Sequence, residues 1–154
     1  MSDIAWQLQP FEGLSTAALY AMLRLRSEVF VVEQQCLFPD IDGLDPACLH
    51  LSAWRGEHLL AYARLMPPGL KAPAPVIGRV VTAPEARGIG LGHQLNRQAV
   101  QACLQRWPGQ GITLFAQAHL QDFYGRAGFV GVGEPFDEDG ILHREMHRPP
   151  GDLL

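Results

Sequence analysis

The sequence predicts a mixed α/β fold in a single domain that spans residues 1–154. Short runs rich in β-branched residues alternate with longer segments whose apolar residues recur at helical spacing. A glycine-rich turn lies in the middle part of the chain, directly between one such run and one helical segment. The composition, 47% hydrophobic and 18% charged, is typical of a folded soluble protein with one core.

The first half of the expected order β-α-α-β-β-β-α-β-α-β-β rests on caps and apolar spacing. A strand at residues 4–8 precedes Ser15, a typical helix N-cap, and apolar residues then follow at helical spacing as far as Phe30. A break between two helices is expected at residues 29–33. Residues 38–46 combine turn-forming residues with three carboxylates and are expected to form a loop.

Six further runs have the β-branched or alternating composition of strands. They cover residues 50–54, 59–66, 76–82, 112–116, 129–132 and 142–147. Residues 55–58 suit a hairpin turn, whereas residues 135–140 are expected to form a loop. Two later helices are expected, an amphipathic one over residues 91–107 and a short one over residues 120–127.

Charge and residue spacing exclude several classes of function. The chain has 12 basic and 16 acidic residues, a net charge of −4, and no basic stripe of the kind that nucleic-acid-binding proteins carry. Cys36, Cys48 and Cys103 lack metal-binding or disulfide spacing and the histidines are scattered, so we expect no metal. No leader-like segment and no apolar stretch of about 20 residues is present, so we expect a cytoplasmic protein without a membrane partner.

The turn Arg87-Gly88-Ile89-Gly90-Leu91-Gly92 has the features of an anion site. The first turn of a helix leaves backbone N–H groups unpaired, and the helix dipole adds partial positive charge there. Gly88, Gly90 and Gly92 carry no Cβ atom that would obstruct a phosphate, and Arg87 adds a positive charge. The turn therefore predicts a phosphate-binding loop, with a tight turn that binds nothing as the structural alternative.

Two common phosphate loops do not fit this turn. A P-loop requires Gly-Lys-Ser/Thr, and the sequence has Gly-His-Gln at residues 92–94. A dinucleotide-binding fold places its glycines in the first βα unit and an acidic residue about 20 positions later, at the end of a second strand. Here the turn lies mid-chain, and the predicted helix runs through that position.

Several segments together resemble one known family. Residues 76–92 resemble the acetyl-CoA-binding motif of the GNAT N-acetyltransferase superfamily, with its Arg/Gln-x-x-Gly-x-Gly/Ala signature, and residues 123–129 resemble the family's Tyr-x-x-x-Gly-Phe segment. Residues 25–34, 40–43 and 116–120 resemble the ElaA-like branch of that superfamily. The resemblance extends over essentially the whole chain.

The resemblance implies a fold and an acyl donor. The GNAT fold is a twisted mixed sheet of about six to seven strands flanked by about four helices, in which a splayed strand pair holds the cofactor. The implied donor substrate is acetyl-CoA, whose pantetheine arm would pair with the backbone of Val80, Val81 and Thr82. Its pyrophosphate would be held by residues of the glycine turn and the helix start, namely Arg87, Gly88, Ile89, Gly90, Leu91, Gly92 and His93.

The resemblance places Tyr124 where many family members protonate the departing thiolate. A phenol of ordinary pKa about 10 is protonated at neutral pH and is suited to this role, with simple core packing as the alternative. Many relatives carry a glutamate base on the strand before the turn, but this strand has none. His119 is therefore the leading candidate base, because imidazole accepts protons near neutral pH. Glu33 is the second candidate, and a water chain is the third.

The acceptor is the least constrained part of the prediction. Asp40, Asp42 and Asp45 either line an entrance that favours a cationic amine or form a solvated acidic turn. Arg64 and Arg79 lie in apolar strands and need partners such as Asp42, Glu33 or the substrate, so Arg79 joins Asp40 and Asp42 as a candidate acceptor contact. The expected activity is acetyl transfer to a primary amine of a small molecule or peptide. The alternative is a non-catalytic CoA-binding sensor or interaction module, and a homodimer is left open.

Overall fold

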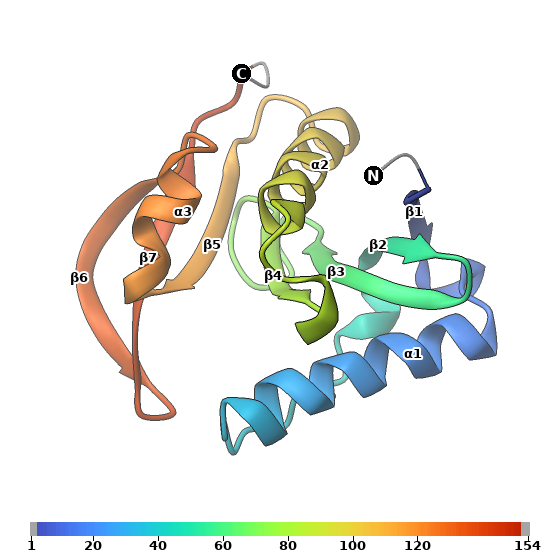
Figure 1. The fold of residues 1–154 in the computed structure, drawn as a ribbon. Coiled ribbons are helices and arrows are strands. Elements are labelled where there is room, and N and C mark those ends of the chain that lie inside the picture. Colours follow the sequence, from blue (N-terminus) through green and yellow to red (C-terminus); the bar gives the residue numbers. More distant parts are fainter. Residues whose placement is uncertain (1–2, 152–154) are drawn as a thin grey trace. The chain divides into compact units, whose positions relative to one another are not determined.

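The computed structural model describes residues 3–151 of the chain. It divides into two compact units, which we describe separately. The first unit comprises the described residues through Arg64 together with Arg79–Leu95, and the second comprises Leu65–Gly78 together with the described residues from Asn96 onward. Figure 1 shows the elements of both units along the chain. A single domain over residues 1–154 stays a prediction.

The strands form a mixed seven-stranded sheet in the order β1-β2-β3-β4-β5-β7-β6 (Figure 1). The strands are β1 (Ala5–Pro10), β2 (Leu49–Arg55), β3 (His58–Met66), β4 (Val76–Thr82), β5 (Ile112–Gln117), β6 (Val130–Glu138) and β7 (Ile141–Arg148). β4 and β5 are parallel and pair at Val76 opposite Thr113, whereas β1–β2, β5–β7 and β6–β7 are antiparallel. The predicted α/β class and strand number are confirmed.

The described residues contain three α-helices instead of the expected four or so. They are α1 (Thr16–Arg26), α2 (Leu91–Arg106) and α3 (Gln121–Gly125). Ser15 caps α1 as predicted, since its side chain accepts a hydrogen bond of 3.0 Å from the Ala18 N–H. The predicted break after α1 is wrong, because the chain continues without interruption as a π-helix over Ser27–Glu33.

In the first unit, a buried face of α1 and its π-helical extension is built from residues at helical spacing. Met22, Leu25, Arg26 and Val29 are all at most 6% exposed. Three of them are apolar, so Arg26 is a charged residue inside an otherwise apolar stripe. The β2–β3 hairpin turns at Gly56, whose φ is +59°. Residues 55–58 therefore form the turn that the sequence predicts.

In the second unit, the main correction concerns residues 135–140. They were expected to form a loop, but β6 continues to Glu138 and pairs with β7 through Phe136 opposite His143. An irregularity in register between Val132 and Phe136 accommodates Pro135 within the strand. The turn itself is Asp139-Gly140, where both residues have positive φ, as a tight hairpin requires.

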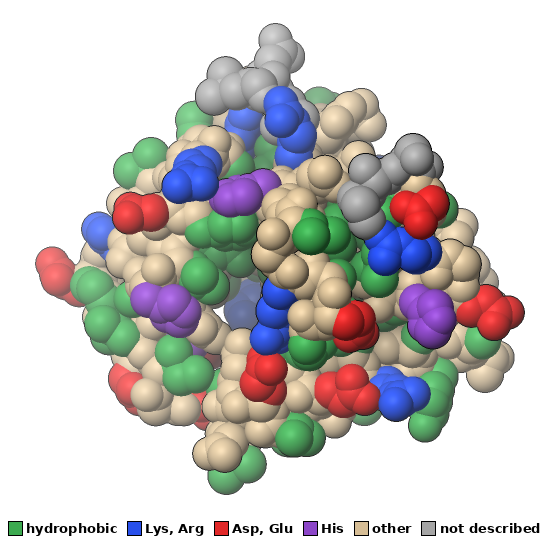
Figure 2. All heavy atoms as spheres, in the orientation of Figure 1, with side chains coloured by type: hydrophobic (Ala, Val, Ile, Leu, Met, Phe, Trp, Pro, Cys, Tyr) green, Lys and Arg blue, Asp and Glu red, His purple; other side chains and the backbone are tan. Residues whose placement is uncertain are grey.

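Charge is distributed without a dominant sign on the face drawn in Figure 2, where acidic and basic side chains of the described residues are interspersed. All three cysteines are buried and unbridged, and Cys103 is 0% exposed within α2. No helix in the described part of the chain is long and apolar enough to cross a membrane.

Candidate functional site

The part of strand β4 that belongs to the first unit, residues 79–82, has an unusual conformation at its start, just before the residues predicted to bind the donor. Arg79 has a φ of +52°, in the left-handed region that residues with a Cβ rarely adopt. Val80 and Thr82 follow and are half-buried, whereas Val81 is buried. After the strand, the Ala83 N–H donates a 2.8 Å hydrogen bond to the Leu60 carbonyl and holds the chain beside β3.

The glycine turn connects β4 with α2 and is open to solvent. A short 3₁₀ turn over Pro84–Ala86 leads into it, and α2 begins at Leu91. Gly88 and Gly90 have φ values of +84° and +79°, and a Cβ atom built on either would meet no atom of the described residues within 4 Å. Open backbone at the start of a 16-residue helix is the geometry that suits an anion.

Arg87, the cation of the turn, is paired with Glu33 at the end of the π-helix. Its Nη2 and Nη1 atoms lie 2.7 and 3.1 Å from the two carboxylate oxygens, so the pair is bidentate. Both side chains are exposed, at 43% for Arg87 and 45% for Glu33. The hydrogen bonds from Arg87 lower the pKa of Glu33, which makes this carboxylate a weaker base.

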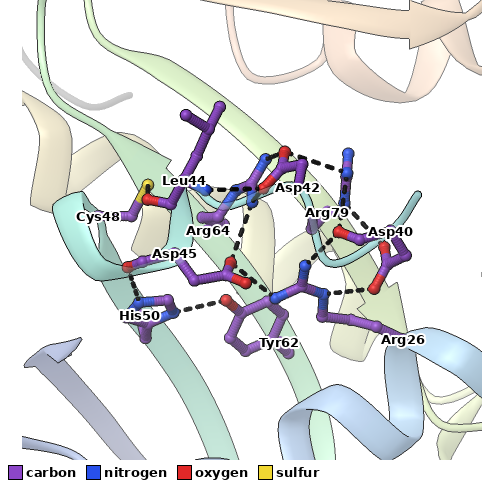
Figure 3. A network of polar contacts seen from close by, with 10 residues as sticks. All are labelled: Arg26, Asp40, Asp42, Leu44, Asp45, Cys48, His50, Tyr62, Arg64 and Arg79. Carbon is purple, nitrogen blue, oxygen red and sulfur yellow. Dashed lines mark hydrogen bonds and ion pairs between the residues drawn. The ribbon is translucent and has the colours of Figure 1, made fainter. Parts of the chain in front are cut away.

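A larger group of charged side chains, buried or half-buried, lies in the same unit (Figure 3). We call it the arginine–aspartate network; its members are Arg26, Arg64, Arg79, Asp40, Asp42 and Asp45. The three cations balance the three carboxylates. Arg26 and Arg64 are each 1% exposed, and Asp40 and Asp45 are 7% and 5% exposed. Burial of so many charges requires this degree of pairing.

Asp45 lies between the two fully buried arginines. Its Oδ1 atom accepts hydrogen bonds from Arg26 Nη1 at 2.8 Å and from Arg64 Nη1 at 2.9 Å. Arg64 also contacts both oxygens of Asp42 at 2.8 Å. Burial opposes ionisation of Asp42 and Asp45, yet the hydrogen bonds from the arginines outweigh it and lower the pKa of both carboxyls.

A buried histidine and tyrosine extend the arginine–aspartate network beneath Asp45 (Figure 3). His50 Nε2 lies 2.9 Å from the Asp45 carbonyl oxygen, which can only accept, so this nitrogen carries the proton. His50 Nδ1 then accepts a 2.6 Å hydrogen bond from the Tyr62 hydroxyl. Burial lowers the pKa of His50 and raises that of Tyr62, so both are neutral at pH 7.

The sequence left open whether the three aspartates line an acceptor entrance or form a solvated acidic turn, and their burial bears on the second alternative. The solvated-turn alternative is wrong for Asp40 and Asp45, which are buried, whereas the Asp42 side chain is 22% exposed. Arg64 and Arg79 both contact Asp42, as one of the predicted pairings proposed. Sequence reasoning assigned no role to Arg26, although a charged residue within the apolar stripe of α1 was a usable signal.

Tyr124 and His119 lie in the second unit, whereas the glycine turn belongs to the first. Tyr124 is 7% exposed and meets the rings of Phe123 and Phe129 edge-on, at centroid distances of 5.0 and 6.2 Å. Burial raises the pKa of Tyr124 to about 12. His119 is exposed, in the 3₁₀ turn Ala118–Leu120 between β5 and α3, as its sequence position predicted.

Comparison with known proteins decides the family. A family model described as an acetyltransferase (GNAT) domain matches residues 18–148. The chain belongs to the GNAT acetyltransferase family. Protein ElaA of Escherichia coli is 43% identical over 147 residues, which cover 94% of this chain and 96% of that protein. This similarity confirms the ElaA-like branch within the GNAT family.

Solved structures of GNAT proteins agree with this assignment. An acyl-CoA N-acyltransferase from Pseudomonas aeruginosa is 49% identical and superposes with a TM-score of 0.90, over 94% of this chain and 99% of that one. The crystal structure of E. coli ElaA is 42% identical with a TM-score of 0.89, over the same shares of the two chains. The GNAT fold and an acyl-CoA-dependent N-acyltransferase activity are therefore established at the level of the family.

Proposed function

We propose that this GNAT enzyme transfers an acetyl group from acetyl-CoA to a primary amine of a small molecule or peptide. The observation that carries the proposal is the exposed turn at Gly88 and Gly90, whose positive φ and open surroundings leave the backbone accessible at the start of α2. A pyrophosphate is the part of acetyl-CoA that such a turn suits. No metal takes part in the proposed reaction, and location in the cytoplasm stays a prediction.

The donor is proposed to lie along two neighbouring segments of the first unit. Val80, Val81 and Thr82 would pair through their backbone with the amides of the pantetheine arm. The pyrophosphate would be held by the turn and the helix start, comprising Arg87, Gly88, Ile89, Gly90, Leu91, Gly92 and His93. Arg87 has five N–H donors and uses two of them for Glu33, so it can pair with a phosphate as well.

Tyr124 is proposed as the general acid. The neutral amine attacks the thioester carbonyl, the carbon–sulfur bond of the resulting tetrahedral intermediate breaks, and the phenol gives its proton to the departing thiolate. A pKa of about 12 keeps the phenol protonated at neutral pH, which an acid requires. The same value argues against Tyr124 as the base that takes a proton from the amine.

His119 remains the leading candidate base, with Glu33 second and a water chain third. Arg87 lowers the basicity of Glu33, whereas His119 is exposed in a turn next to α3. For the acceptor, Asp40, Asp42 and Arg79 stay predicted contacts. Asp42 is the most accessible carboxylate of the arginine–aspartate network, with 22% of its side chain exposed, so it is the one we favour for a cationic amine.

The test is thiol release from acetyl-CoA in the presence of an amine library grouped by charge. Tyr124→Phe removes only the hydroxyl and is expected to lower kcat by about 100-fold, the lower end of the usual range for a general acid, with CoA affinity unchanged. Tyr20→Phe is the matched control, since Tyr20 is 70% exposed on α1. An unchanged kcat in Tyr124→Phe would remove Tyr124 from the mechanism.

The alternative is a CoA-binding module without turnover, favoured by the absence of a carboxylate from β4. Calorimetry with CoA separates the two. Binding without any amine that raises thiol release above hydrolysis would favour the module. Failure of wild-type protein to bind CoA would contradict both proposals.

A further inference from the structure

Arg79 has a backbone conformation that is disfavoured for any residue with a Cβ atom. Its φ of +52° brings the Cβ atom too close to the backbone, and in the described chain only Gln35 and Asp139 share such a value among residues other than glycine. Gly78, which could adopt a positive φ without strain, directly precedes Arg79 but does not adopt one. Such a conformation persists only where surrounding contacts impose it.

Asp40 supplies the two shortest polar contacts of the Arg79 guanidinium. Arg79 Nε lies 2.8 Å from Asp40 Oδ1, and Arg79 Nη2 donates to the Asp40 carbonyl oxygen at 3.1 Å. A longer contact of 3.4 Å joins Nη2 to Asp42 Oδ2, and the guanidinium lies over the Phe38 ring at 5.0 Å from its centroid. The guanidinium is thus held on several sides by residues of one loop.

Asp40 is itself fixed from α1. Arg26 Nε pairs with the other carboxylate oxygen, Oδ2, at 3.0 Å, and Arg26 Nη2 donates to the Asp40 carbonyl at 2.8 Å. One carboxylate therefore joins a buried helix arginine to the strained residue of β4 (Figure 3). Because Asp40 is only 7% exposed, its carboxylate contacts other side chains of the protein and little solvent.

We propose that Asp40 is a positioning residue for the acyl donor, which acts by holding Arg79 at positive φ through the ion pair with its guanidinium. The inference rests on the proposed donor site, because residue 79 directly precedes Val80–Thr82. A change of φ at residue 79 rotates the backbone that follows and redirects the polar groups of those three residues. This role for Arg79 differs from the acceptor contact predicted from the sequence.

Two substitutions at residue 79 separate backbone conformation from side-chain contact. Arg79→Ala and Arg79→Gly both remove the guanidinium and all its ion pairs, but only glycine tolerates positive φ without strain. We expect Arg79→Ala to weaken acetyl-CoA binding about tenfold, because alanine abandons the strained positive φ once the ion pairs are gone. In Arg79→Gly, the dissociation constant for acetyl-CoA should stay within about threefold of the wild-type value. Arg24→Ala is the control, because Arg24 lies on α1 and forms a solvent-exposed ion pair with Glu28.

Calorimetric titration with acetyl-CoA gives the dissociation constants, and backbone chemical shifts of residues 78–82 report φ directly. Equal constants for the alanine and glycine variants, whether both weak or both near wild type, would overturn the proposal. Failure of wild-type protein to bind acetyl-CoA would instead contradict the proposed function, so the two failures are distinguishable. Thermal melts first establish the temperature at which every variant is folded.

Asp40→Asn tests the ion pair itself. In the wild-type background it is expected to weaken acetyl-CoA binding by about tenfold, and in the Arg79→Gly background it should add less than about twofold. An equal loss in both backgrounds would show that Asp40 acts by another route and would overturn the proposal. If Arg79→Ala does not fold, this second comparison decides the question.

Discussion

The first unit contains two sets of arginines and carboxylates that differ in burial, number and accessibility. In the arginine–aspartate network, Arg26 and Arg64 are 1% exposed and each contacts two carboxylates. At the glycine turn, Arg87 is 43% exposed and pairs with Glu33, which is itself 45% exposed. A ligand can replace or share an exposed pair at little cost, whereas a buried set of charges holds the backbone in place. The first set supports the fold, and the second is available to a phosphate.

Removal of Asp45 should have the largest effect on stability. Asp45→Ala leaves the facing guanidinium groups of Arg26 and Arg64 buried with one carboxylate fewer. We expect the free energy of unfolding to fall by about 3–5 kcal/mol, measured by urea denaturation. Glu28→Gln in the exposed pair with Arg24 is the control and should cost less than about 0.5 kcal/mol. Equal losses would erase the contrast between buried and exposed pairs.

Acid should destabilise the protein through the same network. The folded protein lowers the pKa of Asp42, Asp45 and His50, so the unfolded chain binds more protons as the pH falls. The free energy of unfolding should therefore decline from about pH 6.5 through His50, and more steeply from about pH 4 through the two aspartates. Urea midpoints between pH 7 and pH 3 measure this decline. Asp42→Asn should flatten the acidic part, and a flat profile in wild-type protein would contradict the assigned pairs.

A substitution in the glycine turn should weaken acetyl-CoA binding at least as much as it lowers the free energy of unfolding. Gly90→Ala places a Cβ atom at a φ of +79°, in space that no atom of the described residues occupies and that we propose for the pyrophosphate. We expect about tenfold weaker acetyl-CoA binding by calorimetry. Gly56→Ala is the matched control, because Gly56 has a φ of +59° and equally open surroundings in the β2–β3 turn. Both substitutions should cost about 1 kcal/mol of stability, but weaker binding in both would argue against a specific role for Gly90.

Glu33→Gln should have the smallest effect. It removes the charge that competes with phosphate for Arg87, so acetyl-CoA affinity should rise by about two- to threefold at low salt, and less at high salt. Turnover should change little if His119 is the base. A tenfold loss of kcat at unchanged affinity would instead identify Glu33 as the base, with Arg87→Ala as the control for loss of the turn's cation.

The elements and the conformation of the glycine turn were largely predictable because their signals are local. Ser15, the β4 run and the glycines at 88 and 90 each act through neighbours within a few residues. The Asp139-Gly140 hairpin was equally local and was missed, since the acidic residues around it were interpreted as a loop. The π-helix after α1 has no comparable local signature.

The arginine–aspartate network could not be predicted in full, because its partners are separated along the chain. Arg26 is 14 positions from Asp40 and Arg79 is 39 positions away from it, so only the tertiary fold brings the three together. The positive φ of Arg79 has no local sequence signal either, because the neighbouring Gly78 could adopt such a value more easily and does not.

The most direct test of the account is an NMR titration of wild-type protein with CoA, read amide by amide. We expect the largest chemical-shift changes at residues 87–93 and 80–82, with small changes at Asp45 and His50 of the buried network. Binding without shifts in the glycine turn would contradict the assignment of that turn to the donor pyrophosphate.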